Sequence, residues 1–346
     1  MNILTIHSAY AHHSENSGYK QILKFISPKV SLLYNEKDLS DKNWFNLRYR
    51  WSIEFEIKKY LKGIDLIHVL YGEEYLRFTP FLYPKKPLVV TFHLPPKTLQ
   101  KHIEAGNGMG KIDSLTHYLT KQRFQKIDRA IVTEKNQFEV LKKVMPEEKI
   151  RIIPLGIYLT DFFAAFQEFY KANIQRENKV IVLGNWLRDW ELLLKVALAL
   201  NKNDVKIHLV GRNIPLDEKQ KLREAPNIIV ENDLSDRELK KLLYTSKVSF
   251  LPLKEAAGNN ALMESLAMGC HAVMSNVVSN SFPFKSEALS LINGDEPALY
   301  TKKILEVFEL SESQYNSFAH KGQESVKPYD WQQVANKTKE VYKELL

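Results

Sequence analysis

Short apolar runs of β type alternate with longer segments of helical periodicity along the whole chain, and this alternation limits the possible folds more than any other feature. Strands that alternate with helices build βαβ units, in which parallel strands form one sheet with helices on its faces. We therefore expect an α/β protein made of doubly wound parallel sheets. The pattern predicts strands at residues 2–7, 29–33, 66–70, 88–93, 129–133, 151–153, 180–184, 206–211, 228–231, 248–251 and 271–274, and first-half helices at 18–26, 53–62, 112–126 and 136–145.

The length of 346 residues and the restart of the strand pattern near residue 180 indicate two domains. We predict one Rossmann-like domain over residues 1–156, a second over 157–325, and a terminal segment over 326–346. Ligands of open parallel sheets bind beyond the carboxyl ends of the strands. We therefore expect the ligand in a cleft between two domains that face each other.

Composition excludes several classes of protein. Hydrophobic residues make up 44% of the chain and charged residues 26%, which is typical of globular proteins and unlike disordered ones. No apolar run approaches the roughly 18 residues of a membrane-spanning helix, and the first residues do not form a secretory signal, so we expect a cytoplasmic protein. The single cysteine, Cys270, excludes an internal disulfide and a zinc site of paired cysteines.

Positive charge is concentrated in the first half of the chain. Residues 1–156 contain 25 Lys and Arg against 16 Asp and Glu, whereas residues 157–346 contain 24 against 25. This excess suggests an anionic partner, such as a membrane surface to which the protein binds peripherally, although solvated surface lysines explain it equally well. Residues 43–62 interleave aromatic and basic side chains, which suits either a lipid interface or a buried helix face. Because no nucleic-acid recognition motif is present, we expect no nucleic-acid partner.

Residues 248–269, VSFLPLKEAAGNNALMESLAMG, predict a strand, a turn of small residues and then a helix. The start of such a helix offers unpaired backbone N–H groups to phosphates or sugar hydroxyls, here near Gly258, Asn259 and Asn260. Glu264 lies about one turn into the helix. Its carboxylate suits hydrogen bonds from a ribose diol, or it interacts with the helix dipole at the surface.

The end of this segment, ESLAMG, resembles the donor-site motif of glycosyltransferase family 4, the group 1 retaining glycosyltransferases of GT-B fold. The family has two glutamates eight residues apart, and Glu264 matches the second. Ala256 stands where the first is expected, with Glu255 beside it. The resemblance implies a ribose-binding role for Glu264 and leaves Glu255 as the candidate for the carboxylate that contacts the donor sugar.

Three further segments are similar to the family in the expected order, so the resemblance spans nearly the whole chain. Residues 149–162 resemble its interdomain signature, with Leu155 and Tyr158 in place of an asparagine and an aspartate. Residues 234–244 resemble the helix that precedes the donor-site strand. Residues 329–345 resemble the terminal helix that crosses back onto the first domain.

A diphosphate leaving group requires positive charge, because negative charge develops on its oxygen as the bond breaks. In the family, cations for this purpose follow the first strand of the second domain. Here that loop begins at Gly184 and contains Arg188, and Lys254 is the candidate for a second cation. Ordinary surface ion pairing is the alternative role for both.

In the first domain, His93 ends an apolar strand in the sequence TFHLPP. The family resemblance implies that it contacts the donor sugar or the reacting centre, whereas a purely structural histidine is the alternative. Gly18, before the first helix, would allow the backbone to approach the diphosphate or the acceptor closely.

We expect neither a metal nor a cofactor. His12 and His13 are adjacent, so their side chains point apart on an extended chain. The glycine-rich residues 106–111 lack the first glycine and the hydroxyl residue of a phosphate loop, and the sequence has no Asp-x-Asp pair for a divalent ion.

The resemblance implies a metal-independent retaining glycosyltransferase that moves a sugar from a nucleoside diphosphate sugar, with UDP or GDP as the expected nucleotide. The implied acceptor is a glycan or a glycolipid, in surface polysaccharide or glycoconjugate assembly. Two alternatives stay open. One is a GT-B-like binding or accessory subunit without catalysis, suggested by Ala256, Leu155 and Tyr158; the other is a nucleotide-sugar epimerase of the same architecture.

Overall fold

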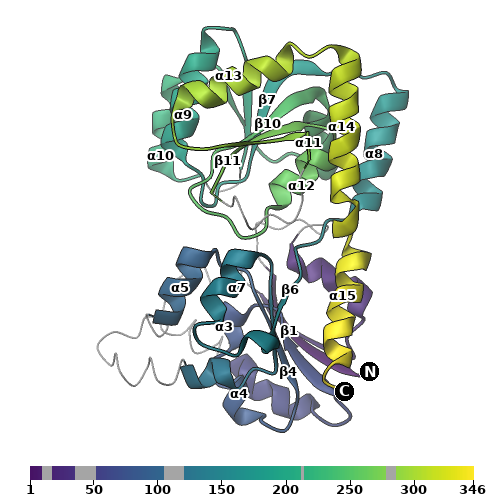
Figure 1. The fold of residues 1–346 in the computed structure, drawn as a ribbon. Helices are drawn as coiled ribbons and strands as arrows, with labels where there is room; N and C mark the ends of the chain where they lie inside the picture. Colours follow the sequence, from purple (N-terminus) through teal and green to yellow (C-terminus); the bar gives the residue numbers. More distant parts are fainter. Residues whose placement is uncertain (10–17, 36–51, 105–120, 212–213, 278–285) are drawn as a thin grey trace. The chain divides into compact units, whose positions relative to one another are not determined.

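The computed structural model describes residues 1–9, 18–35, 52–104, 121–211, 214–277 and 286–346. Its contacts divide the chain into two compact units (Figure 1). The first unit contains residues 1–156 and 331–346, and the second contains residues 157–330. Each unit is built around one six-stranded sheet.

The sheet of the first unit has the strand order β2-β1-β3-β4-β5-β6, and every neighbouring pair runs parallel. β3 and β4 are buried along their whole length, as the central strands of a sheet with helices on both faces must be. The strands are β1 (Ile3–Ala9), β2 (Val30–Asn35), β3 (Leu66–Val69), β4 (Leu88–Phe92), β5 (Arg129–Val132) and β6 (Ile150–Ile152). The helices of this unit whose bounds are fully described are η1 (Tyr19–Ile22), α1 (Leu23–Ile26), η3 (Ile57–Tyr60), α3 (Gly72–Tyr75), α4 (Thr79–Leu82), α5 (Pro96–Glu104), α7 (Lys135–Leu141), η4 (Glu147–Lys149) and α15 (Trp331–Lys343).

Helix α3 begins in direct contact with β4. A Cβ atom at Gly72 would lie 2.4 Å from Val90 Cγ1 and 2.6 Å from Phe92 Cε1, so no larger residue fits without displacing the strand's side chains. This close approach places Glu73 beside the carboxyl end of β4.

The last helix, α15, returns to the first unit and packs there through buried polar contacts. The Tyr342 hydroxyl lies 2.6 Å from His68 Nδ1, and His68 Nε2 lies 2.8 Å from Thr91 Oγ1. His68 is fully buried, and burial lowers its pKa to about 3. The histidine is therefore neutral and connects the helix to strand β4.

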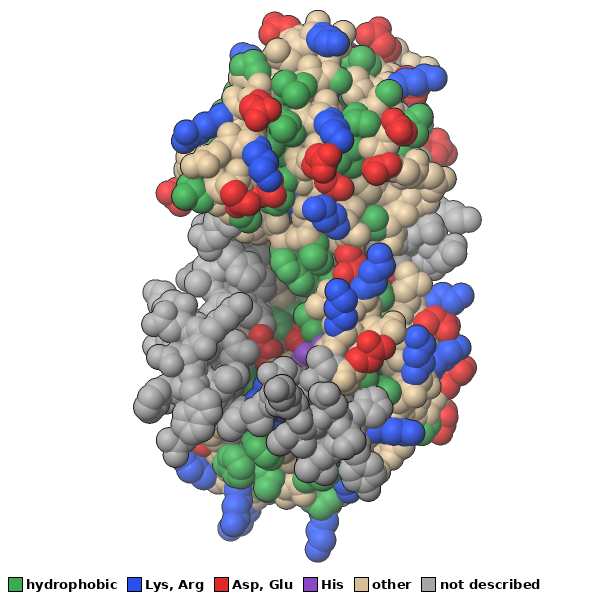
Figure 2. Space-filling view, turned by 90° about the vertical axis from the view of Figure 1, so that its left-hand side faces the viewer, with side chains coloured by type: hydrophobic (Ala, Val, Ile, Leu, Met, Phe, Trp, Pro, Cys, Tyr) green, Lys and Arg blue, Asp and Glu red, His purple; other side chains and the backbone are tan. Residues whose placement is uncertain are grey.

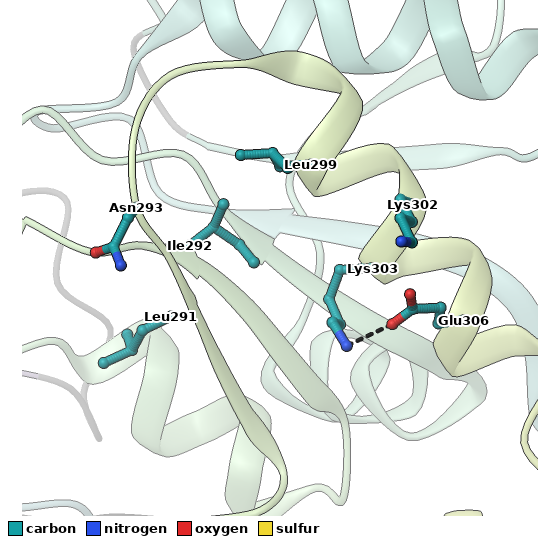
Figure 3. Close-up of a pocket in the computed structure, with 7 residues that line it drawn as sticks. All are labelled: Leu291, Ile292, Asn293, Leu299, Lys302, Lys303 and Glu306. Carbon is teal, nitrogen blue, oxygen red and sulfur yellow. Dashed lines mark hydrogen bonds and ion pairs between the residues drawn. The ribbon is translucent and has the colours of Figure 1, made fainter.

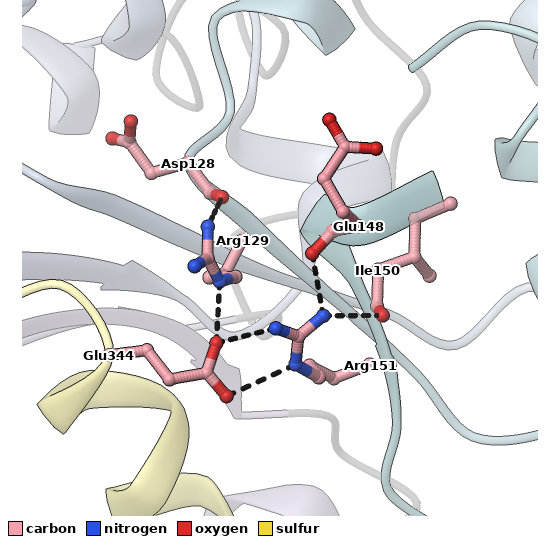
Figure 4. A network of polar contacts seen from close by, with 6 residues as sticks. All are labelled: Asp128, Arg129, Glu148, Ile150, Arg151 and Glu344. Atoms are coloured by element: carbon pink, nitrogen blue, oxygen red, sulfur yellow. Dashed lines mark hydrogen bonds and ion pairs between the residues drawn. The ribbon is translucent and has the colours of Figure 1, made fainter. Parts of the chain in front are cut away.

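An ion-pair network attaches the end of the chain to the edge of the same sheet (Figure 4). Glu344 Oε2 accepts a hydrogen bond of 2.7 Å from Arg129 Nε and one of 2.6 Å from Arg151 Nη2. Glu344 Oε1 accepts a third, of 3.1 Å, from Arg151 Nε. Because the two guanidinium groups stabilise its charged form, the pKa of Glu344 lies below its usual value.

The sheet of the second unit has the order β12-β11-β10-β7-β8-β9, again with parallel neighbours throughout. Its strands are β7 (Glu177–Leu183), β8 (Ile207–Val210), β9 (Ile228–Glu231), β10 (Ser246–Leu251), β11 (His271–Ser275) and β12 (Leu289–Ile292). Its helices are α8 (Leu159–Lys171), α9 (Trp190–Asn201), α10 (Leu216–Lys221), η5 (Leu222–Glu224), α11 (Asp236–Thr245), α12 (Asn260–Ala267), α13 (Pro297–Phe308), α14 (Glu312–Val326) and η6 (Lys327–Tyr329).

Strand β7 shows how helices cover both faces of this sheet. Val180 and Val182 pack on one face in a cluster with buried side chains of α9 and α13. Ile181 and Leu183 pack on the other face with buried side chains of α8 and α11. Successive side chains of a strand point to opposite faces, so the sheet is doubly wound. The predicted α/β class with two doubly wound sheets is therefore confirmed.

The aromatic and basic segment at 43–62 is described only from Ser52 onward. Ile53 and Ile57 are buried in the first unit, whereas Phe55 is 52% exposed and Tyr60 is 41% exposed. On the face shown in Figure 2, basic and acidic side chains of the described residues are interspersed over the second unit. Membrane association stays a prediction.

Candidate nucleotide-sugar site

The strand order of the second sheet marks one place for a ligand. The parallel strands β7 and β10 are neighbours although β8 and β9 lie between them in sequence, so the order in which strands are added to the sheet reverses at this point. In doubly wound sheets the crevice beyond such a switch point binds the ligand. The loops that follow these two strands are the ones that the sequence singled out, at residues 184–189 and 252–260.

Backbone hydrogen bonds hold these two loops together. The N–H of Asp189 donates to the carbonyl of Pro252 over 2.9 Å, and the N–H of Lys254 donates to the carbonyl of Leu187 over 3.0 Å. Asp189 then accepts a hydrogen bond of 3.1 Å from the N–H of Leu192 and caps α9. The position of Arg188, between the two loop contacts, is therefore set by rigid elements.

Arg188 is only 8% exposed. Its Nε donates to the carbonyl of Leu183 over 2.9 Å, its Nη2 donates to the same oxygen, and its Nη1 donates to the carbonyl of Trp186 over 3.2 Å. A guanidinium has five N–H groups, so two remain for a ligand. Among the described residues no carboxylate pairs with it, and burial alone lowers its pKa, to about 10.

Gly184 supports this arrangement. Its φ of +77° is a backbone conformation that favours glycine, and a Cβ atom there would lie 3.0 Å from Arg188 Nη2. A larger residue would therefore crowd the guanidinium.

The start of α12 has both engaged and open polar groups. The Oδ1 atom of Asn259 accepts a hydrogen bond of 3.1 Å from the N–H of Leu262, so this side chain caps the helix. The Oδ1 atom of Asn260 is buried and has no hydrogen-bond partner within the described part of the chain. Gly258 precedes them with a φ of +61°. The turn thus has an acceptor available for a hydroxyl group.

Glu264 lies partly buried on α12, and its carboxylate makes no hydrogen bond to any residue that the structure describes. Burial raises its pKa to about 7, the negative charge of Asp236 raises it further, and Lys240 opposes both. Lys240 itself pairs with Asp161. A carboxylate in this setting gains from hydrogen bonds that a ligand supplies.

The first glutamate of the family motif has no direct counterpart in space. Ala256 stands at its position with only a methyl group, and it is buried, 7% exposed. Glu255 is half-buried and Lys254 is exposed. The roles of Glu255 and Lys254 stay predictions.

His93 lies in the first unit at the carboxyl end of β4, where the sequence placed it. Its Nε2 atom is 2.8 Å from the carbonyl oxygen of Leu70, and its ring packs against Tyr19 and Tyr71 at centroid distances of 4.5 Å and 4.8 Å. Gly18, with a φ of +83°, precedes η1 in the same unit. His12, His13 and residues 106–111 lie outside the described residues.

Sequence reasoning missed Glu73, whose carboxyl oxygens accept from the N–H of His93 at the end of the neighbouring strand. A signal for it was present, because Gly72, Glu73 and Glu74 follow an apolar strand in the first predicted domain. Across the described ranges, no three His, Cys, Asp or Glu side chains are grouped as a metal site. Metal independence stays a prediction.

A shallow pocket of about 320 Å³ lies elsewhere in the second unit, at the edge strand β12 and the helix α13 (Figure 3). Its lining includes the ion pair of Lys303 and Glu306. None of the residues that the sequence singled out lines it. The lining residues are Leu291, Ile292, Asn293, Leu299, Lys302, Lys303 and Glu306.

Comparison with known proteins identifies the family to which the donor-site sequence belongs. Residues 177–309, from β7 to the end of α13, match the family described as Glycosyl transferases group 1. This segment is a group 1 glycosyltransferase domain. The family resemblance seen in the sequence is thereby confirmed. No curated protein matches the chain by sequence.

Solved structures extend the likeness to the whole chain. Sucrose-phosphate synthase from Thermosynechococcus elongatus has a TM-score of 0.76 at 16% identity, over 99% of this chain and 98% of that chain. HepE from Anabaena, solved in complex with UDP-glucose, has a TM-score of 0.70 at 12% identity, over 99% and 100%. A glycosyltransferase from Rickettsia africae has a TM-score of 0.68 at 15% identity, over 99% and 98%. These similarities establish that the group 1 domain is part of a GT-B fold.

Among the described residues, every helix is too short or too polar to cross a bilayer.

Proposed function

We propose that this protein is a retaining glycosyltransferase that uses a nucleoside diphosphate sugar as donor. The observation that carries the proposal is Arg188, a buried guanidinium with two free donors and no anion in the described part of its surroundings, at the switch point of the second sheet. A buried cation is costly unless it is paired. A diphosphate at this position would pair with it.

The other groups of the site suit the rest of such a donor. Glu264 would accept hydrogen bonds from the ribose diol, and the turn around Asn260 would contact phosphate or sugar hydroxyls. One structural neighbour was solved with UDP-glucose, which makes UDP-glucose the first donor to test. GDP sugars are the second choice, and the acceptor would be a glycan or a lipid-linked glycan.

In the proposed reaction the bond between the anomeric carbon and the diphosphate oxygen breaks while the acceptor oxygen bonds to the same carbon on the same face. The acceptor proton passes to the leaving phosphate oxygen, so no metal and no carboxylate nucleophile is required. Arg188 would stabilise the charge that develops on that oxygen.

Thermal stability with UDP-, GDP-, ADP- and TDP-sugars in the presence of EDTA tests donor binding. A nucleotide at 100 times its Kd adds about 2.7 kcal/mol to the stability of the native protein. Release of free nucleotide that requires an added acceptor then demonstrates transfer. Absence of a shift with all four nucleotides, with and without magnesium, would contradict the proposal.

A second candidate is a binding subunit of the same fold that has lost catalysis. The buried Ala256 favours it, because the family's first motif carboxylate is missing there. A stability shift with a nucleotide sugar that is never followed by nucleotide release, with glycan or lipid-linked acceptors, would support this candidate.

A further inference from the structure

Helix α4 and the helical residues 52–60 of the first unit expose large apolar side chains. Phe55 is 52% exposed, Phe81 38% and Leu82 40%. In Figure 2 apolar side chains gather at the lower end of the first unit, and basic side chains project beside them. Contiguous exposed apolar side chains with a polar rim mark interaction surfaces.

Contacts between the two segments make this surface continuous. The ring centroid of Phe55 lies 5.3 Å from that of Phe78, which stands three residues before Phe81. The hydroxyl of Tyr83, the residue after α4, donates a hydrogen bond of 2.8 Å to the carbonyl of Glu54. The two segments therefore lie side by side.

A buried carboxylate fixes the start of α4 from the inside. Glu54 is fully buried, and its Oε2 accepts hydrogen bonds of 2.7 Å from the N–H of Phe78 and 2.6 Å from the N–H of Thr79. The Thr79 hydroxyl donates to the same oxygen over 2.7 Å. Because this anchor is buried, the exposed side chains of α4 can be replaced without breaking it.

The segments that form and border this surface are strongly basic. Eight Lys and Arg stand against two Glu in residues 52–62, 78–86 and 121–127. Of the two glutamates, Glu54 is buried, and Glu56 lies 3.8 Å from Lys59. Neither carboxylate neutralises the remaining lysines of these segments.

Three lysines border the exposed apolar side chains. The Lys126 ammonium lies 5.7 Å from the centroid of the Phe81 ring. Lys58 and Lys85 are exposed, and each follows an exposed apolar residue of the surface by three positions. Lysine stems pack along apolar groups while their charged ends stay in a polar environment.

We infer that this apolar and basic surface, formed by Phe55, Phe81 and Leu82 with Lys58, Lys85 and Lys126, binds an anionic lipid bilayer. The apolar side chains would enter the boundary between headgroups and acyl chains, and the ammonium groups would contact lipid phosphates. A second copy of the chain is a poorer partner, because a symmetric dimer would bring the lysines of both copies together.

Cosedimentation of the full chain with lipid vesicles tests the inference. We expect binding to phosphatidylcholine vesicles that contain about one third phosphatidylglycerol, and little binding to phosphatidylcholine alone. Binding should weaken as NaCl rises from about 50 mM to about 500 mM, because salt screens the lysines.

Two sets of substitutions separate the apolar contribution from the basic one. Phe81→Ser combined with Leu82→Ser should weaken vesicle binding at least about tenfold. Replacement of Lys58, Lys85 and Lys126 by alanine should weaken it about fivefold per lysine, or about a hundredfold together.

Matched controls lie in the second unit. Leu216→Ser removes an apolar side chain that is 72% exposed, and alanine at the exposed Lys171, Lys202 and Lys241 removes the same charge as the lysine variant. Both controls should bind vesicles within about twofold of the wild type.

A fluorescent label reports insertion directly. Leu82→Cys can be labelled with a dye whose emission shifts to the blue in an apolar environment, because the native Cys270 is buried. We expect this shift with anionic vesicles and none with phosphatidylcholine alone.

Failure of the wild type to bind anionic vesicles would overturn the inference. So would wild-type binding by both sets of variants, each with native circular dichroism, or a dimer that these substitutions dissociate in a protein that ignores vesicles. Vesicle binding requires neither donor nor acceptor. A protein that binds vesicles through this surface but no nucleotide sugar therefore counts against the proposed function alone.

Discussion

The carboxyl edges of the two sheets follow the same topological rule but differ in the charge of their buried side chains. At the edge of the second sheet, Arg188 keeps a buried charge and Glu264 has a carboxylate that lacks hydrogen bonds from the described residues. At the edge of the first sheet, burial keeps both Glu73 and His93 neutral at pH 7. Similar backbone frames thus carry a buried cation at the edge of the second sheet and a buried, uncharged histidine at the edge of the first.

The largest difference in stability between the two units should appear at low pH. Burial lowers the pKa of four described histidines in the first unit, to about 4 for His7, His93 and His102 and about 3 for His68. In the second unit it does so only for His271 among the described ones. The unfolded chain binds protons near pH 6.5 whereas the folded histidines do not, so stability is lost as pH falls from 6.5 toward 4.

We therefore expect the first unit to open before the second between pH 6.5 and pH 4.5. Hydrogen exchange resolved by peptide measures this directly. Loss of protection in both units at the same pH would contradict the expected difference in acid stability between them.

Arg188→Ala should reduce transferase activity by about 10²–10³-fold, the usual effect of removing one group that stabilises the transition state. Arg188→Lys should recover part of it. Arg237→Ala, which removes an exposed arginine paired with Glu168, is the control and should retain full activity. Full activity in Arg188→Ala would show that this cation does not stabilise the leaving group at the candidate nucleotide-sugar site.

Gly72→Ala should destabilise the first unit without affecting the candidate nucleotide-sugar site of the second. Its Cβ atom would overlap Val90 and Phe92, and overpacking of this kind costs about 1–3 kcal/mol. We expect a lower melting temperature of the first unit and unchanged nucleotide binding. Gly294→Ala, where a Cβ atom would meet nothing within 4 Å, controls for the general effect of alanine. Because Gly294 has a φ of +88°, some strain is expected there, but no displacement of neighbouring side chains.

Glu264→Gln should weaken nucleotide binding about tenfold and stabilise the free protein at alkaline pH. The folded-state pKa of about 7 lies above the ordinary value of 4.5, so ionisation destabilises the native state progressively as pH rises from 4.5 through 7. The melting temperature of the variant should therefore equal that of the wild type near pH 4.5 and exceed it at pH 8. Glu191→Gln, at an exposed glutamate, should show no such gain. Equal melting temperatures of Glu264→Gln and wild type at pH 8 would contradict the proposed burial of the carboxylate.

The smallest effect is expected for Glu344→Gln, which weakens the network that holds the end of the chain (Figure 4). The three side chains are partly exposed, so a loss of at most about 1 kcal/mol is expected in chemical denaturation. Nucleotide affinity should not change. A change larger than that of Gly72→Ala would mean that anchoring of the chain's end dominates the stability of the first unit.

Most of the fold was predictable because burial of apolar strands leaves a direct mark on sequence. Each predicted strand is present with bounds that differ by at most three residues, the largest difference being the start of β7, and the short β6 and β9 are among them. β12 was missed, since its four residues, LSLI, lie only partly buried at the sheet edge and follow no clear turn signal. The helix expected at 112–126 lies mostly outside the described residues.

The sequence by itself determined the class of fold, the family and the two loops of the second unit, because periodicity and a short local motif are readable without a structure. Only the tertiary structure showed that Arg188 is buried, and that among the described residues no anion pairs with Arg188 and no hydrogen bond reaches the Glu264 carboxylate. It alone brought Glu73 to His93, across twenty residues of chain. Protonation states depend on burial and on neighbours from distant segments, and these exist only once the sheets have formed.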